Sequence, residues 1–289
     1  MITKTRTSDA IEMTIHPRRI VHRTRGRPHG PIVRLVSPSG VGEMIKPFVF
    51  LDYIETAPEH APAFGFHPHS GIATLTLLLN GAVSYEETTG VKGVIEPGGI
   101  EWMRAGGGVW HSGSMLGTDL VKAFQLWVAL PPELESSPAE SQYLAADQFE
   151  SHGPARVILG RYGNATSKVS APDTMNYLDV TLKAGERWHY KPPRGHTVAW
   201  IAVHSGAVTT PATVSKGEIA VFEESSDAIE FEARGDDAAF ILGSAVKHPH
   251  ALVLGTHSVH TSQNALERGE ANITKIGQQL WAEGRLSPI

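Results

Sequence analysis

Apolar residues along this chain occur in short runs that are separated by glycine and proline turns, and this pattern predicts β-strands. Five such stretches follow one another in the first half: 31–38, 46–55, 72–90, 93–108 and 121–131. Gly81 and the Pro97-Gly98-Gly99 triplet interrupt two of them, as hairpin turns do. Regular strands with glycine turns and little helical periodicity indicate a β-sandwich or barrel.

A second series of predicted strands begins after a segment of different composition. Residues 131–149 are rich in proline, serine and acidic residues, which is typical of a connection between domains. We therefore expect an N-terminal domain at 1–130, a linker at 131–149 and a C-terminal domain at 150–289. Near the end, Ile273, Ile276 and Leu280 recur at helical spacing, so a short C-terminal helix should pack on a sheet, with Gly284 and Pro288 marking its end.

The two halves resemble each other weakly. The sequence "LLLNGAVS" at 77–84 resembles "AVHSGAVT" at 202–209, and each is followed by a glycine turn and an apolar strand. Aligning Gly81 with Gly206 places Pro192 and Arg194 where the first half has His67 and His69. The pattern predicts two similar barrels, of which only the first carries these histidines.

Composition narrows the classes of function. The 289 residues include no cysteine, which excludes thiol catalysis and disulfides, and the formal net charge is −5. No apolar stretch approaches the ~20 residues of a spanning helix, and the N-terminal residues lack an apolar export signal. We expect a soluble cytoplasmic protein without affinity for membranes or nucleic acid. The basic segment 16–30 holds five arginines and is interpreted as a solvated N-terminal segment or a lid over the barrel.

Candidate metal ligands lie in the stretch "FHPHSGIATLTLLLNG" at 66–81. On a strand, His67 and His69 point to the same side, ~6.6 Å apart along the backbone. Pro68 lacks an N–H group, which favours the start of a strand or an edge strand. A glycine-rich bend follows the predicted strand at 100–103, and a hairpin-based barrel can return His111 from beyond it to the first pair. These three imidazoles are the predicted metal site.

Other side chains leave alternatives open. A second His-Pro-His triplet at His248 and His250 lacks a comparable arrangement, so loop contacts or surface polarity are favoured for these residues and for His257 and His260. His189 and His196 are interpreted as structural. Trp102, Met103 and Trp110 flank the predicted site; they could stack on an aromatic substrate or belong to the core.

Three stretches resemble the pirin family of bicupin proteins: "HPHSGIATLTLLLNG", "VKGVIEPGGIEWMRAGGGVWHS" and "GTHSVHTSQNALERGEANI". The resemblance implies an all-β fold of two cupin-type (jelly-roll) barrels. It also implies metal ligation by His67, His69 and His111, with Fe(II) as the usual metal and Zn, Ni, Mn or Cu as alternatives. Some family members resemble quercetin 2,3-dioxygenases, and others resemble transcriptional co-regulators.

The chain departs from the family pattern at the carboxylates. The family's fourth ligand is a glutamate two residues past the last histidine, and Gly113 stands there. A second acidic position of the family is Ala73 here. Glu101, on the preceding strand, could in principle compensate, but an outward orientation set by strand alternation is favoured.

Two functions from different classes remain. The first is an O2-dependent dioxygenase that acts on a flavonol or related small aromatic enol at a three-histidine metal centre. The second is a non-enzymatic, metal- or redox-responsive regulator that binds a protein partner. Residue types alone assign no catalytic residue.

Overall fold

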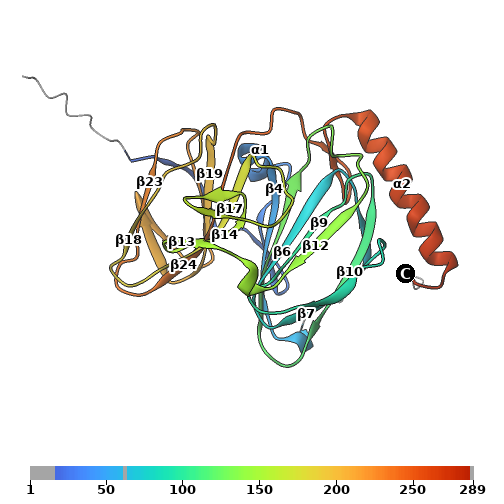
Figure 1. The fold of residues 1–289 in the computed structure, drawn as a ribbon, viewed down its shortest axis with the longest axis horizontal. Coiled ribbons are helices and arrows are strands. Elements are labelled where there is room, and N and C mark those ends of the chain that lie inside the picture. The colour runs from blue at the N-terminus through green and yellow to red at the C-terminus, as the bar shows by residue number, and fades with distance from the viewer. Residues whose placement is uncertain (1–16, 61–63, 287–289) are drawn as a thin grey trace, which may run out of the picture.

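The computed structural model describes residues 17–60 and 64–286. Two β-barrels lie side by side, each built from a large antiparallel sheet that faces a smaller one (Figure 1). The expectation of an all-β protein with two cupin-type barrels and a C-terminal helix is confirmed. The alternating apolar runs form strands because one side of each strand is buried in a barrel or between the barrels.

The first barrel combines a seven-stranded and a four-stranded sheet. The order in the larger sheet is β12 (Glu140–Leu144), β9 (Ile100–Arg104), β6 (Ile72–Asn80), β11 (Val121–Ala129), β4 (Phe48–Thr56), β3 (Ile32–Val36), β2 (Arg27–His29). The order in the smaller sheet is β5 (Phe64–His69), β10 (Val109–Leu116), β7 (Ala82–Glu87), β8 (Lys92–Ile95). Strand β5 ends its sheet, as Pro68 predicts.

The second barrel repeats this plan. Its larger sheet runs β1 (Ile20–Thr24), β22 (Ile219–Phe222), β19 (Val198–Ser205), β24 (Ala238–Ala245), β17 (Met175–Leu182), β14 (Ala155–Leu159), β13 (Ser151–His152). Its smaller sheet runs β18 (Arg187–Tyr190), β23 (Ile229–Glu232), β20 (Ala207–Thr210), β21 (Ala212–Ser215). Two short hairpins, β15 (Arg161–Tyr162) with β16 (Ala165–Thr166) and β25 (Val253–Leu254) with β26 (Val259–His260), complete the described strands, and α1 (Val41–Ile45) precedes β4.

The internal repeat is confirmed by the turns. Gly81 joins β6 to β7 and Gly206 joins β19 to β20, with φ of +81° and +62°. A side chain is strained at such angles. At Gly206 a Cβ would also lie 2.2 Å from the carbonyl oxygen of Asp237. The repeated glycine therefore reflects the same tight turn in both barrels.

A shared core joins the two larger sheets. Trp102 and Phe124 of the first barrel and Tyr177 and Trp200 of the second belong to one buried cluster. The ring of Phe48 meets the edge of Trp200 with 5.4 Å between ring centroids. The opposite face of each larger sheet points into its own barrel, so this core determines which side chains of the first sheet can reach a site inside.

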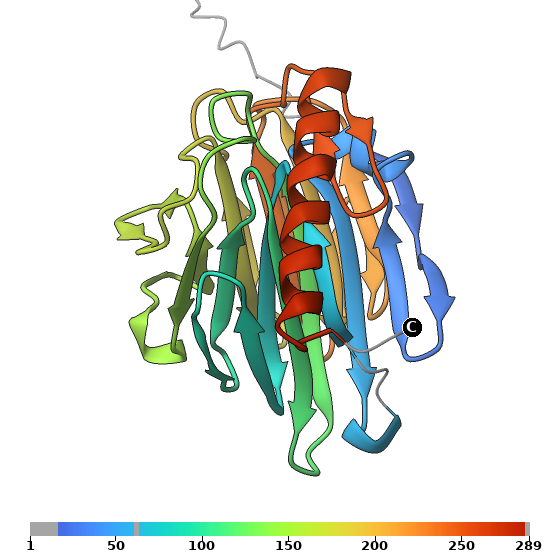
Figure 2. The same cartoon turned by 90° about the vertical axis from the view of Figure 1, so that its right-hand side faces the viewer.

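The terminal segments each pack on the barrel of the other half. Strand β1 pairs with β22 of the second barrel. The C-terminal helix α2 (Gln263–Ala282) packs on β10 and β5 of the first barrel, and Figure 2 shows it running across that barrel. The domain boundaries 1–130 and 150–289 stay a prediction, and these exchanged ends cross them.

The predicted C-terminal helix is confirmed but longer than expected. It spans 20 residues, begins after the N-cap Ser262 and buries Ile273 and Leu280. It stops before Gly284, whose φ of +70° ends the helix. Pro288 lies outside the described residues. None of the helices in the described part of the chain has the length and apolar character needed to cross a membrane.

The interpretation of the basic segment 16–30 is only partly right for its described residues, 17–30. Most of them are exposed to solvent, but they form β1 on the sheet of the second barrel and β2 on that of the first, and so are not a lid over the first barrel. Arg19 pairs with Glu223 at 2.8 Å, and Arg23 pairs with Glu218 at 2.5 Å. Arg18 is buried and its Nε donates to the carbonyl of Glu223 at 2.7 Å. Arg19 and Arg23 are therefore paired with carboxylates of the second barrel, and residue 16 lies outside the described part.

Candidate metal centre

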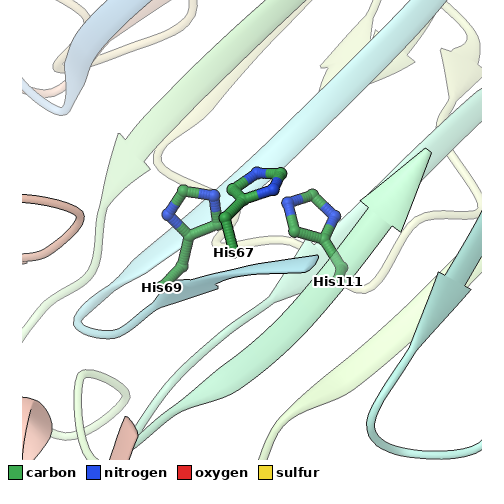
Figure 3. A group of neighbouring side chains, drawn as sticks. All are labelled: His67, His69 and His111. Atoms are coloured by element: carbon green, nitrogen blue, oxygen red, sulfur yellow. The ribbon is translucent and has the colours of Figure 1, made fainter. Parts of the chain in front are cut away.

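Three imidazoles converge inside the first barrel (Figure 3). His67 and His69 lie on β5, and His111 lies on the adjacent antiparallel strand β10, directly opposite His67. One nitrogen from each ring lies within 4.8 Å of the other two. Ring centroids are 4.4 Å apart for His67 and His111, and 5.1 Å apart for each other pair. The sequence prediction that these three side chains meet is confirmed.

The hydrogen bonds of the rings leave the same nitrogen free on each. Nδ1 of His67 donates to the carbonyl of Gly65 at 2.8 Å, and Nδ1 of His69 donates to the carbonyl of His257 at 3.0 Å. A carbonyl can only accept, so Nε2 in both rings keeps its lone pair. Nε2 of His111 is buried and has no hydrogen-bond partner among the described residues. An Nδ1 held by a carbonyl, as in His67 and His69, is the usual arrangement of histidine metal ligands, and the buried, unpartnered Nε2 of His111 calls for a partner.

The electrostatic surroundings also favour the form of His67 and His69 that can coordinate a metal. Burial and the nearby His111 lower the pKa of His67 to about 4, and the same causes lower the pKa of His69 well below its usual value. Both rings are therefore neutral at pH 7, and neutral imidazole is the form that binds metal. A donor set of three imidazoles fits a divalent transition metal.

Glu101 points into the barrel, so the alternative of an outward side chain is wrong. Its Oε1 lies 3.7 Å from Nδ1 of His111, and its carboxylate accepts hydrogen bonds from Thr76 and Tyr143 at 3.1 and 3.2 Å. Burial alone would raise the pKa of Glu101, but His111 and these hydroxyls stabilise the carboxylate and lower the pKa below its usual value. Glu101 therefore places a negative charge behind His111 and not at its free Nε2.

The two carboxylate positions that the sequence lacks are not equivalent in the structure. Gly113 lies on β10 and lines the cavity beside the histidines, so a longer side chain there could reach them. Ala73 on β6 belongs to the core between the two barrels. An acid at residue 73 would point away from the three histidines. The loss at Gly113 is therefore the one that changes the site.

An apolar cavity of about 190 Å³ opens on the three histidines. Its apolar walls include Phe50, Ile54, Val83, Ile95, Met115 and Trp127. The ring of Trp127 stacks on Phe50 with centroids 4.2 Å apart and meets the edge of His69 at 4.9 Å. This tryptophan holds the His69 ring from the side and gives the cavity an aromatic wall next to the candidate ligands.

Of the two alternatives for Trp102, Met103 and Trp110, the structure supports packing within the protein over stacking on a substrate. Trp102 is buried between the barrels, and Met103 is buried in a small cluster with Ala105 and Val109. Trp110 donates from Nε1 to the carbonyl of Ile273 in α2 at 2.7 Å. The aromatic side chain that contacts the ring of His69 is Trp127, which sequence reasoning missed. Trp127 shares a face of β11 with Gln125, two residues away, and this shared face was the available signal, but the sequence did not show that it is the inward one.

The positions of the other histidines agree only in part with the expectations from the sequence. His248 and His260 are buried, at 6% and 2% exposure, so an exposed position on the surface is wrong for them. His257 lines the cavity, and its carbonyl contacts His69, which the sequence did not indicate. His196 is buried and bonded to Ser244 at 2.9 Å, consistent with a structural role. Within residues 17–60 and 64–286, only the cluster His67–His69–His111 forms a group of three or more potential ligands.

Comparison with known proteins supports this description of the fold and site. Residues 32–128 match the family model Pirin. A pirin-like protein of Caulobacter vibrioides is 33% identical over 234 residues, covering 75% of this chain and 84% of the relative. A protein of Pseudomonas aeruginosa named "Putative quercetin 2,3-dioxygenase" is 31% identical over 228 residues, covering 73% and 79%.

Solved structures show the same fold. A quercetin 2,3-dioxygenase of Acinetobacter baumannii aligns with a TM-score of 0.76 and 23% identity, covering 90% of this chain and 96% of that one. The bacterial pirin YhhW of Escherichia coli, solved in complex with nickel(II), aligns with a TM-score of 0.62 and 22% identity, covering 81% and 99%. With its paired barrels, its three-histidine site and relatives that match across most of its length, this chain belongs to the pirin family.

Proposed function

We propose that this pirin binds one divalent metal ion through Nε2 of His67, His69 and His111 and is an O2-dependent dioxygenase for a small aromatic enol. The observation that carries the metal proposal is the set of three inward-facing Nε2 atoms, two of them defined by Nδ1–H bonds to carbonyls and the third buried without a partner. Fe(II) is the first candidate, with Zn, Ni, Mn and Cu as alternatives. When bound, Fe(II) would supply Lewis acidity and redox chemistry.

The chain's own residues support the substrate class. Apolar side chains form most of the cavity wall and exclude water, and Trp127 and Tyr85 offer aromatic surfaces to a planar molecule. A cavity of about 190 Å³ is smaller than the ~300–1,000 Å³ of drug-sized ligand pockets, which favours a compact substrate. An enolate would be attracted to a cation that three neutral ligands leave at its full charge. The name of the Pseudomonas relative points to the flavonol class.

Metal content of the purified protein tests the first half of the proposal. We expect close to one metal ion per chain in the wild type and far less in His69→Ala, because removing one of three ligands lowers affinity steeply. Elemental analysis of both proteins, purified in parallel, gives the ratio. Equal metal content in the two would show that the ion is bound elsewhere.

Turnover tests the second half. Protein loaded with Fe(II) is incubated with quercetin and with smaller aromatic enols, with and without O2. Loss of the substrate's absorbance with release of carbon monoxide, seen only with O2 and absent in His69→Ala, supports a flavonol dioxygenase. An inert, fully metal-loaded protein would refute the enzymatic proposal for these substrates and leave a metal-binding regulator as the alternative.

A further inference from the structure

The segment that precedes and forms the C-terminal helix, Val253–Ala282, reaches back to the histidine strands of the first barrel. We call it the C-terminal segment. Its contact with the site is the carbonyl of His257, which accepts the hydrogen bond from Nδ1 of His69 at 3.0 Å. This bond determines which nitrogen of His69 faces the other two rings. A residue 188 positions away in the chain thus orients the candidate ligand.

A buried polar network holds this carbonyl in place. Ser70, which follows His69, donates from Oγ to Oγ of Ser258 at 2.9 Å, and Nε2 of His260 lies 3.0 Å from the same Ser70 oxygen. Nδ1 of His260 lies 3.3 Å from the carboxylate of Glu135, which accepts from the backbone N–H of Thr261 at 2.7 Å. Ser70, Glu135, Ser258 and His260 are all buried, at 0–4% exposure. Breaking the hydrogen bonds of a buried network is costly, so the segment is fixed rather than loosely attached.

The order serine, histidine, glutamate is that of a hydrolase triad, but the packing excludes a nucleophilic role for Ser70. A Cβ atom on Gly269 of α2 would lie 2.5 Å from both Ser70 Oγ and His260 Nε2. The helix backbone therefore covers the serine completely. The cluster holds the C-terminal segment against β5 and offers no access to a substrate.

The same segment also contacts the second histidine strand. On β10, one residue before His111, Trp110 donates to the carbonyl of Ile273, and a Cβ atom on Gly277 would lie 2.6 Å from the Trp110 ring. Asn272 donates to the carbonyl of Gly107 at 2.9 Å, just before β10 begins. The helix thus touches both strands that carry the three imidazoles.

We propose that the C-terminal segment is a positioning element for the three-histidine site: the His257 carbonyl sets the orientation of His69, and the Ser70–Ser258–His260–Glu135 network with α2 holds that carbonyl and both strands in register. This inference rests on the proposed metal binding. Coupling between sites is reciprocal. A metal ion on the three histidines therefore stabilises the docked segment, and a docked segment raises metal affinity.

Gly269→Ala is the central variant, because its added methyl group intrudes between Ser70 and His260. Alanine is favoured over glycine inside a helix by about 1 kcal/mol, so a weaker helix cannot explain a loss. We expect the affinity for Fe(II), measured anaerobically by competition with a chelator, to fall at least tenfold. Lys275→Ala, on the exposed face of the same helix, serves as the control and should match the wild type. Ser258→Ala is a milder second variant for which we expect a smaller loss, in case Gly269→Ala does not fold.

Two readouts separate positioning from a general loss of stability. In the metal-free protein, 15N NMR of the His69 ring should show Nδ1 protonated in the wild type and a mixture of tautomers in Gly269→Ala. Hydrogen exchange of residues 253–282 in the wild type should slow when Fe(II) is added. Wild-type metal affinity and an unchanged His69 tautomer in both variants would overturn the inference. If the wild type binds no metal, the proposed function fails, and the tautomer comparison still decides whether the segment orients His69.

Discussion

At the scale of single residues, the charge of the site is arranged differently from the family pattern that the sequence suggests. Gly113 removes a carboxylate from the cavity wall, while Glu101 holds one behind the ring of His111. A carboxylate behind a histidine raises the basicity of the nitrogen that faces a metal. Glu101 therefore compensates in part for the lost charge without becoming a ligand.

Replacing Glu101 tests this compensation. Glu101→Gln keeps the shape of the side chain and removes the negative charge beside His111, so we expect metal affinity to fall ~10–100-fold, as is typical when a group behind a metal ligand is changed. Isothermal titration or chelator competition measures the effect. Glu96→Gln, which removes an exposed glutamate from the turn before β9, is the matched control and should leave affinity unchanged. Equal affinities in all three proteins would contradict a role for the Glu101 charge.

Restoring the missing carboxylate is the complementary test. Gly113 does not need a left-handed conformation, and a Cβ there would meet the carbonyl oxygen of Ser84 at 3.2 Å, which a small shift relieves. Gly113→Glu should tighten Fe(II) binding about tenfold, or ~1.4 kcal/mol, because it adds a charged ligand to a neutral set. Ser114→Glu places the same charge on the exposed face of β10 and should have no effect. Unchanged or weaker binding in Gly113→Glu would show that residue 113 cannot reach the metal.

At the scale of elements, the site depends on the pairing of β5 with β10. Antiparallel pairing places His111 opposite His67 and Val109 opposite His69. A one-residue slip would turn the imidazoles of one strand out of the barrel. Tyr85 and Tyr143 stack with centroids 3.6 Å apart, so that β7 of the smaller sheet is packed against β12 of the larger one. Tyr143 also donates to Glu101, so this packing helps to place the charged residue at the site.

The faces of β9 illustrate how an element can be predicted while its orientation is not. Its strand character follows from sequence, and neighbouring residues must point to opposite sides. Trp102 enters the core between the barrels, and Glu101 therefore has to face the barrel interior. From the sequence, Trp102 was placed beside the site and Glu101 was allowed to point outward. Both faces of this strand are buried, so the pattern of apolar and polar residues does not distinguish them.

At the scale of the whole molecule, the two barrels are joined by an ion pair as well as by the shared core. Glu55 on β4 of the first barrel pairs with Lys216 of the second at 2.9 Å and with Lys122 at 3.3 Å. Partial burial acts to raise the pKa of Glu55, but the lysines and the hydroxyl of Tyr53 outweigh it and lower the pKa to about 2. The ionised carboxylate therefore stabilises the contact between the barrels.

This lowered pKa gives stability a defined dependence on pH. Above pH 4.5, the usual pKa of glutamate, the contribution is fully present, and it is lost as the pH falls towards 2. The wild type should exceed Glu55→Gln in free energy of unfolding by up to about 1 kcal/mol at pH 7, since partly exposed pairs contribute little more. The difference should shrink between pH 4.5 and 2. Urea unfolding across this range measures it, with the exposed Glu133→Gln as control; a constant difference would contradict the assignment.

The sequence by itself determined the strands, the glycine turns, the repeated barrel, the C-terminal helix and the common face of His67 and His69. These are local properties, because hydrophobic period and turn chemistry act over a few residues. The tertiary structure decided the inward face of β9 and β11, and with it the roles of Glu101 and Trp127. It also decided the exchange of the terminal segments and the contact of the His257 carbonyl with His69. Such features depend on pairing between residues far apart in the chain. A period of two in the sequence shows that neighbouring side chains lie on opposite faces of a strand, but it does not show which face becomes the interior.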